Sequence, residues 1–256
     1  MRCERDLLRW CNVIIPLEWH DNRRVKTPPY GFGGKMADGF EQMVDAALAF
    51  FAELEQDNTK AWFEPQKARY KDQIAGPAGF FADLLAEDIA RITGQPYKPK
   101  VFRIYRDVRF SKDKTPLNTH LHLMWQPLDQ DALAPTWFWG LSREYFILGM
   151  GVMGLQGESL TRYRAFVDSW GDGLADAMAQ AKVSVGAEIS DWGPEPLKRV
   201  PRPYATDHPH GALLKRKALA ISAPMSDDWR DVGLVKATVE RINGLMPVWE
   251  IFDQHF

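Results

Sequence analysis

Cysteine and long apolar segments are both scarce in this chain. Cys3 and Cys11 are the only cysteines among its 256 residues. They are too few for a disulfide framework or a cysteine-based zinc site, and they favour a reducing compartment. The longest uncharged apolar run, Tyr145–Leu155, contains 11 residues and three glycines, whereas a membrane-spanning helix needs about 20 residues. We therefore expect a cytoplasmic protein without a membrane partner.

Neither sign of charge dominates the composition. The chain has 32 Lys and Arg residues against 34 Asp and Glu, a formal net charge of −2, with 45% hydrophobic and 26% charged residues. This balance is typical of ordinary globular proteins and excludes disordered and collagen-like classes. Signatures of several enzyme classes are also missing, namely a phosphate-binding Walker loop, an HExxH metal motif and a GxSxG nucleophile elbow.

The first 36 residues differ from the rest of the chain. Asn22–Arg24, Pro28–Pro29 and Gly31–Gly34 follow one another without a sustained helical or strand period. We interpret residues 1–36 as a weakly structured leader, or as an over-extended gene start with Met36 as the initiator. Residues 37–256 are expected to form a single domain.

Hydrophobic periodicity predicts the elements of that domain. Helical spacing predicts helices over residues 40–54, 59–70 and 77–92, and a period of two predicts strands over 101–111, 119–126, 137–140 and 145–153. A helix over 158–181 follows, with glycines at 171 and 173 where it could break. The rest is a strand over 183–189, a short helix over 213–217, a strand over 218–222 and a helix over 226–243 that ends at Gly244. Helices first and strands in the middle predict an α+β fold, with a largely antiparallel sheet packed by N-terminal and C-terminal helices.

Positive charge is concentrated between residues 100 and 118, where six basic residues stand against two acids. Arginine binds phosphate and carboxylate through paired hydrogen bonds, and lysine adds a point charge. We therefore predict a pocket for a phosphorylated or carboxylated small molecule. Its predicted anion ligands are Arg103, Arg106 and Arg109, with Lys112 and Lys114 as loop cations that close over it.

Two further residues of this segment are acid–base candidates. Asp107 lies between the arginines and His120 follows the loop, so both are the predicted catalytic residues if the site is enzymatic. The alternative is a salt-bridged surface strand without function, in which Arg106 pairs with a buried carboxylate.

A second basic cluster lies at residues 197–217, with six basic residues and one acid. Its prolines and its Asp-His-Pro-His segment predict an irregular, ordered loop, which is the usual place for site residues. Arg199, Asp207 and His208 are the predicted second wall of the anion pocket if this loop folds over the first cluster. The alternative is a solvated loop.

Two other functions remain open from the residues. His120 and His122 share a strand face and His208 lies beside Asp207, so these four residues suit a metal-assisted hydrolase, although no metal motif is present and we assign no metal ligand or cofactor. The basic segments together with Tyr and Trp residues also suit a nucleic-acid-binding module.

Three motif blocks carry a resemblance to a known family. They are Phe50–Phe63 with Lys67–Tyr70, Arg103–Pro116 with Thr119–His120, and Leu197–Pro201 with Asp207–Pro209 and Leu213–Lys217. Across about residues 40–223 the chain resembles the conserved hypothetical family called domain of unknown function 2461. The resemblance implies no established activity. Two of its blocks coincide with the two basic clusters.

The chain departs from that family's usual pattern at two places. Leu117 and Asn118 stand where the family has an aromatic and a basic residue, so residue 118 supplies no cation here. Pro203 stands where a glycine is usual, which implies a different turn in the second basic loop.

Overall fold

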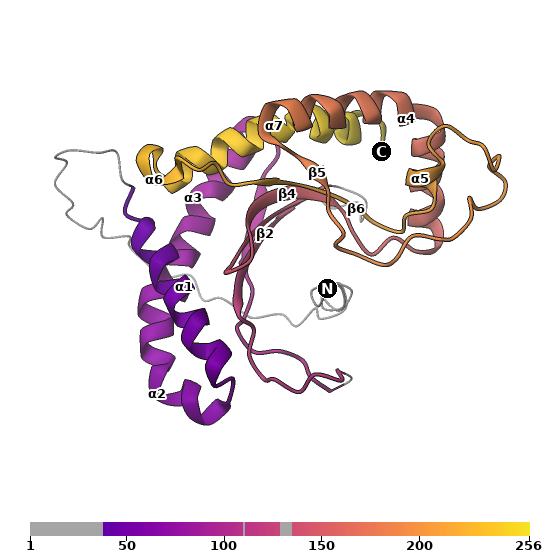
Figure 1. The fold of residues 1–256 in the computed structure, drawn as a ribbon. Coiled ribbons are helices and arrows are strands. Elements are labelled where there is room, and N and C mark those ends of the chain that lie inside the picture. Colours follow the sequence, from indigo (N-terminus) through magenta and orange to yellow (C-terminus); the bar gives the residue numbers. More distant parts are fainter. Residues whose placement is uncertain (1–37, 110, 129–134) are drawn as a thin grey trace.

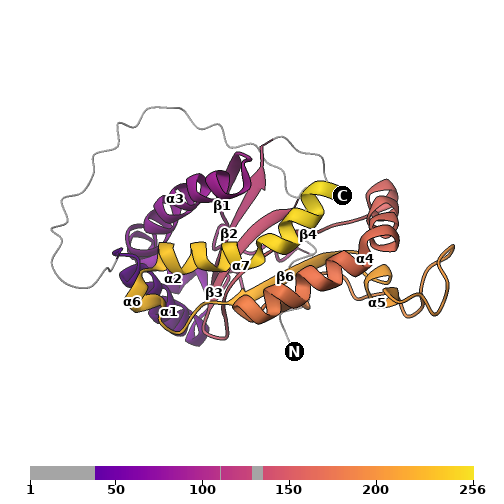
Figure 2. The ribbon, with the colours of Figure 1, turned by 90° about the horizontal axis from the view of Figure 1, so that it is seen from above.

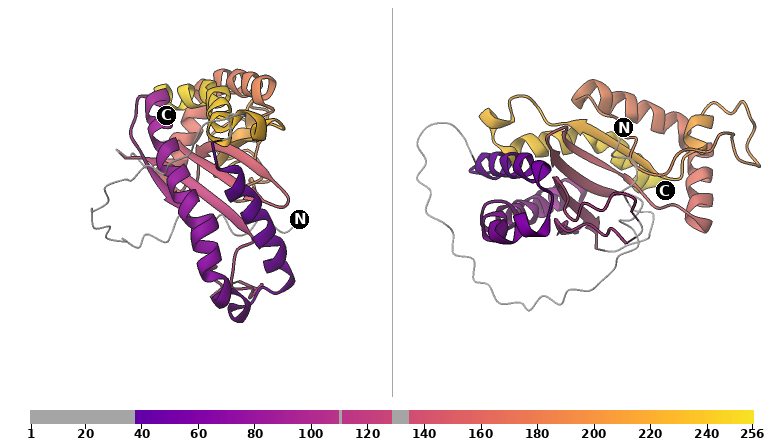
Figure 3. Two further views of the ribbon diagram at one scale, coloured as in Figure 1. Left: turned by 90° about the vertical axis from the view of Figure 1, so that its left-hand side faces the viewer. Right: turned by 60° about the horizontal axis from the view of Figure 1, so that its bottom comes forward.

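Three helices open the part of the chain that the computed structural model describes, which is residues 38–109, 111–128 and 135–256. These are α1 (Glu41–Gln56), α2 (Lys60–Tyr70) and α3 (Gly76–Thr93), with one π-helical turn, η2 (Lys71–Ala75), before α3. The hydroxyl of Thr59 accepts a hydrogen bond from the N–H of Trp62 at 3.2 Å and so caps α2. The three predicted N-terminal helices are confirmed, and they pack together at one end of the sheet (Figure 3).

Six strands form one antiparallel sheet in the order β1-β2-β3-β4-β6-β5. The strands are β1 (Tyr97–Val101), β2 (His120–Pro127), β3 (Thr136–Ser142), β4 (Phe146–Val152), β5 (Glu188–Ile189) and β6 (Leu219–Pro224). The sheet curves strongly, and helices lie along its outer, convex side (Figure 1). The predicted α+β class with a largely antiparallel sheet is therefore confirmed.

The convex face of the sheet holds the core against the helices. The indole N–H of Trp125 donates to the carbonyl of Ala82 in α3 at 2.8 Å, and the ring of Trp139 packs edge-on against Phe81 with centroids 5.5 Å apart. Trp137 and Trp139 are both buried. Because side chains alternate along a strand, the residues between them face the concave side, away from the helices.

Two long helices, α4 (Gly157–Val185) and α7 (Leu234–His255), lie side by side over the sheet (Figure 2). Both run through glycines that predicted a break or an end, so those two predictions are wrong. A Cβ at Gly171 would lie 2.2 Å from the ring of His210, and one at Gly244 would lie 2.2 Å from Val185. These glycines therefore allow close packing within continuous helices. The short helices α5 (Gly211–Leu214) and α6 (Trp229–Val232) precede and follow β6.

Two predicted strands are also wrong. The first strand ends at Val101, and the described residues between 103 and 118 form a loop instead of extending the strand to Ser111. The helix α4 continues to Val185 and ends at Gly186, which has a left-handed backbone, so only two residues of the predicted 183–189 strand pair with β6.

No helix within the described ranges is long and apolar enough to cross a bilayer. The interpretation of residues 1–36 concerns residues outside the described part of the chain, and the single domain over 37–256 stays a prediction.

Candidate functional site

The first basic cluster forms a closed loop between β1 and β2. The N–H of Arg106 donates to the carbonyl of Pro116 at 2.8 Å, and the N–H of Asn118 donates to the carbonyl of Ile104 at 2.7 Å. Tyr105 and Leu117 form an isolated antiparallel bridge between the two arms. The alternating sequence therefore builds a narrow hairpin-like base, above which residues 107–109 and 111–115 form the tip.

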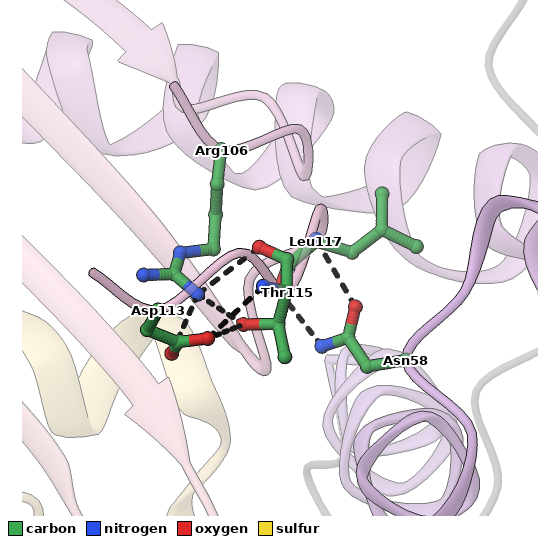
Figure 4. A network of polar contacts seen from close by, with 5 residues as sticks. All are labelled: Asn58, Arg106, Asp113, Thr115 and Leu117. Atoms are coloured by element: carbon green, nitrogen blue, oxygen red, sulfur yellow. Dashed lines mark hydrogen bonds and ion pairs between the residues drawn. The ribbon is translucent and has the colours of Figure 1, made fainter. Parts of the chain in front are cut away.

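Side chains at the tip of this loop bond to its own backbone (Figure 4). The guanidinium of Arg106 donates to the carboxylate of Asp113 at 2.9 Å and to the hydroxyl and carbonyl of Thr115. The carboxylate of Asp113 in turn accepts from the N–H and the hydroxyl of Thr115 at 3.0 and 2.9 Å. Such local bonds compete with a β ladder, which explains why the strand stops before this segment.

The network holds Asp113 in its ionised form. The N–H and hydroxyl of Thr115, followed by the guanidinium of Arg106, lower the pKa of Asp113 to about 2. Only 12% of the Arg106 side chain is exposed. The structure thus gives Arg106, one of the predicted anion ligands, a position inside the loop, where it fixes the loop's shape.

Asn58, at the corner between α1 and α2, fastens the loop to the helices. Its amide donates to the carbonyl of Leu117 at 3.0 Å and accepts from the N–H of Leu117 at 3.1 Å, as an adjacent strand would (Figure 4). Leu117 is almost fully buried. Asn58 was not among the predicted site residues, although it belongs to the first motif block.

The remaining cations of the loop lie on its outside. The guanidinium of Arg109, whose side chain is 74% exposed, forms two hydrogen bonds with the carboxylate of Asp107, at 3.0 and 2.7 Å. The ammonium of Lys114 donates to the carbonyl of Val108 at 3.0 Å. Arg103 and Lys112 are exposed. Asp107, a predicted catalytic residue, therefore lies in an ion pair with a predicted anion ligand.

His120 belongs to a cluster of rings on the concave face of the sheet, which we call the concave ring cluster. Its members are His120, His122, Phe138, Tyr145 and Trp192. The rings of His120 and His122 are stacked with centroids 3.9 Å apart, and Trp192 lies 5.3 to 5.8 Å from Phe138, His122 and Tyr145. The cluster thus joins residues of β2, β3, the β3–β4 turn and the segment after β5.

Two glycines make room for these rings on the sheet. A Cβ at Gly149 would lie 2.4 Å from the ring of Phe138, which is opposite it in the β3–β4 ladder. A Cβ at Gly140 would lie 3.1 Å from the ring of Tyr145 and 3.2 Å from that of His122. The rings therefore lie close against the sheet, over positions that have no side chain.

His122 is the buried centre of the cluster. It is 5% exposed, and its Nε2 lies 2.6 Å from the hydroxyl of Tyr145. Burial, together with the charge of His120, lowers the pKa of His122 well below its ordinary value, so its imidazole is neutral at pH 7. The site therefore contains a neutral imidazole and a phenol in direct contact.

The second basic cluster lies in a different part of the molecule. The loop of residues 103–118 projects below the sheet, whereas the segment before α5 lies at the far side, beyond α4 (Figure 1). His208 Nε2 lies 3.0 Å from the carboxylate of Asp168 in α4, and His208 Nδ1 accepts from the N–H of His210 at 3.0 Å. Both ring nitrogens of His208 are therefore used to dock this segment on α4.

The other two residues of the predicted second wall lie on the surface. Arg199 and Asp207 are both exposed, and His210 forms a second docking pair with Asp172 at 2.8 Å. The segment is ordered and irregular, as predicted, but the structure does not bring it onto the loop of residues 103–118.

A comparison with protein-family models finds a match over most of the chain. The model described as a conserved hypothetical protein, DUF2461, matches residues 46–250. The chain belongs to the DUF2461 family. This confirms the resemblance inferred from the three motif blocks. Curated proteins contain no significant match. In this DUF2461 structure the three motif blocks correspond to the α1–α2 corner, the loop of residues 103–118 and the segment docked on α4.

The metal-site interpretation finds no geometric support among the residues that the structure describes. They contain no group of three or more His, Cys, Asp or Glu side chains arranged to hold a metal ion. His120 and His122 belong to the concave ring cluster, whereas His208 is bonded to Asp168. A surface depression of about 310 Å³ lies beside α1 and the β3–β4 turn within the described ranges. None of the predicted site residues lines it, and its two cations, Arg143 and Arg230, form ion pairs with Glu55 and Asp45.

Proposed function

We propose that the concave face of the sheet binds a small anionic molecule that carries a planar ring, with a phosphate or a carboxylate as its anionic group. The observation that carries this proposal is the concave ring cluster. Its rings lie on the face of the sheet that is turned away from the described helices, and they surround a neutral, buried imidazole. Aromatic and imidazole rings are suitable partners for a flat ligand.

Cations beside the cluster supply the anionic part of the proposed site. In the β1–β2 ladder Lys98 is opposite Gln126 and Lys100 is opposite Met124, so both lysines share the face of the ring cluster. Both are exposed. The loop of residues 103–118 begins at the end of the same strand. We therefore assign ligand contacts to Lys98 and Lys100, followed by the outer cations of the loop: Arg103, Arg109, Lys112 and Lys114.

Proton transfer, if the site is enzymatic, is assigned to His120 rather than to Asp107. His120 is partly exposed beside the buried His122, whereas the carboxylate of Asp107 accepts two hydrogen bonds from Arg109. A carboxylate held in this way is directed at the guanidinium of Arg109 and not at a ligand. Arg106 is assigned to the shape of the loop.

A thermal-shift screen tests this function. The panel consists of aromatic phosphates and aromatic carboxylates at 1 mM, with inorganic phosphate and acetate as ring-free controls. A ligand with a Kd of about 10 μM stabilises the folded state by about 2.7 kcal/mol at this concentration, which raises the Tm by about 5 to 11 °C for a chain of this size.

Two variants and a matched control decide whether the stabilisation comes from the proposed site. Lys98→Ala/Lys100→Ala and Trp192→Ala should each reduce the shift caused by a hit compound. The control Lys60→Ala/Lys71→Ala removes the same charge from two exposed lysines near α2 and should leave the shift unchanged. The proposal fails if no ring compound raises the Tm, or if the control and the site variants respond alike.

A further inference from the structure

The second basic cluster is a surface built from two stretches of chain. The N–H of Leu197 donates to the carbonyl of Lys215 at 2.8 Å, which brings the residues after 197 beside those around 215. The side chain of Arg164 in α4 donates to the carbonyl of Leu214 at 3.3 Å and so joins this surface to α4. We call this the 197–217 cationic surface, after its six cations: Lys198, Arg199, Arg202, Lys215, Arg216 and Lys217.

The charge of this surface is not neutralised within the described part of the chain. No carboxylate there forms an ion pair with any of the six cations. Asp168 and Asp172 of α4, which contact this segment, are bonded to His208 and His210. Residues 197–217 carry a formal charge of +5 in a chain whose total is −2. Mutual repulsion of these cations is relieved by a partner with several negative charges.

The surface is held in place before any partner arrives. The two histidine–aspartate pairs fasten the segment to α4, and the ring of His210 lies against Gly171, where α4 has no side chain. The segment stands at the outer edge of the molecule (Figure 1). A pre-ordered, accessible surface loses little conformational entropy on binding.

The shape of the surface favours a single strand as its partner. Apart from the four-residue helix α5, the segment is irregular. It offers neither a long helix nor a two-stranded ribbon, which are the elements that fit the major groove of a duplex. Surfaces that bind single strands instead combine backbone-tracking cations with a ring on which a base stacks. Tyr204, in the middle of the segment, is partly exposed and contacts His208 at a centroid distance of 6.3 Å.

We propose that the 197–217 cationic surface is a docking site for single-stranded nucleic acid, with its six cations on the phosphates and Tyr204 on a base. This is a second binding function, separate from the concave face of the sheet. It uses different residues, so either proposal can fail without the other.

Fluorescence anisotropy with the full chain and a labelled mixed-sequence 20-mer tests the proposal. We expect saturable binding whose log K falls with log salt concentration with a slope between about −2 and −4, because each phosphate contact contributes about −0.7 for a single strand. Binding of the duplex of the same sequence should be at least fivefold weaker. Poly-glutamate of equal charge should compete at least tenfold less well than the unlabelled 20-mer.

Charge-matched variants locate the binding. Arg199→Ala/Lys215→Ala/Arg216→Ala should weaken binding at least tenfold, and Tyr204→Leu should weaken it three- to tenfold without changing the salt slope. Lys198→Gln/Arg199→Gln provides a milder variant, since both residues are exposed. The control Lys60→Ala/Lys71→Ala/Lys236→Ala removes three exposed cations elsewhere and should change affinity less than twofold.

Three results would overturn the proposal. They are the absence of salt-sensitive binding to the 20-mer, equal competition by poly-glutamate, which would indicate an acidic protein segment as the partner, and equal losses in the surface variant and the control.

Discussion

Asn58→Ala is the sharpest test of how the loop of residues 103–118 is held. The substitution removes both hydrogen bonds between the Asn58 amide and the backbone of Leu117. Leu117 is 1% exposed, so its N–H and carbonyl lose their partners where water has little access. An unsatisfied buried polar group costs about 1 to 3 kcal/mol. We expect a loss of about 2 to 4 kcal/mol in the free energy of unfolding, or about 4 to 16 °C in Tm.

Urea denaturation measures this loss, and amide hydrogen exchange shows where the structure loosens. Exchange should accelerate at residues 104–106 and 116–118 more than in the sheet, since these residues form the base that Asn58 fastens. Asn118→Ala is the matched control. Its side chain makes one long hydrogen bond, 3.3 Å, to the carbonyl of Arg103, so we expect a loss below about 1 kcal/mol.

Asn58→Asp separates the two hydrogen bonds from the turn preference of this position. Aspartate favours the same corner conformations as asparagine and still accepts from the N–H of Leu117. It cannot donate to the carbonyl of Leu117, and its charge repels that oxygen. We therefore expect Asn58→Asp to be at least as destabilising as Asn58→Ala. A stability close to that of the unmodified chain in either variant would refute the reasoning.

Three further outcomes can be checked by denaturation. Gly171→Ala should cost about 1 to 3 kcal/mol because its Cβ would lie 2.2 Å from His210, whereas Gly79→Ala, which meets open space in α3, should stabilise by about 0.5 to 1 kcal/mol. The lowered pKa of Asp113 means that its contribution to stability is complete above about pH 4 and is lost as the pH falls toward its folded value of about 2, so Asp113→Asn should flatten the stability profile in that window. Trp125→Phe should cost about 2 to 4 kcal/mol, because it removes the buried donor to the backbone of α3 and leaves a space in the core.

The helices and most strands followed from hydrophobic periodicity, but the ends of elements did not. Gly171 and Gly244 predicted interruptions because a glycine lowers helix propensity. The structure uses the same property for contact with His210 and Val185. Helix propensity describes an isolated helix, so it carries no information about a side chain from a distant part of the chain that packs against that helix.

The loop of residues 103–118 was mistaken for a strand for a related reason. Its alternation of charged and apolar residues fits a period of two, but the carboxylate of Asp113 and the hydroxyl of Thr115 bind the local backbone and one another. Side chains that compete with the ladder in this way are a sequence signal for a turn. The Asp-Lys-Thr-Pro stretch carried that signal.

The concave ring cluster was not predicted as a unit. His120 and His122 were singled out, whereas Tyr145 and Trp192 were not. Strand register decides which residues meet across a sheet, and a shift of one residue would move Phe138 to the opposite face. Trp192 reaches the cluster from a segment with no strand period at all, so its partners could not be found without the fold.

The motif between Arg103 and Pro116 contains buried residues that hold the loop together and exposed residues that do not, and substitutions of the two kinds should differ in their effect on stability. Arg106→Ala removes a mostly buried guanidinium that bonds to Asp113 and Thr115. Hydrogen bonds to charged groups contribute about 1.5 to 3 kcal/mol, and because Asp113 is 61% exposed we expect a smaller loss, about 1 to 2 kcal/mol. Arg103→Ala changes an exposed side chain and should alter stability by less than about 0.5 kcal/mol, while weakening any anion bound beside β1. Urea denaturation of both variants, combined with the thermal shift of a hit compound, compares the two effects. If Arg106→Ala left both stability and hydrogen exchange of the loop unchanged, the guanidinium would be a ligand-facing group, and the division of the motif would be wrong.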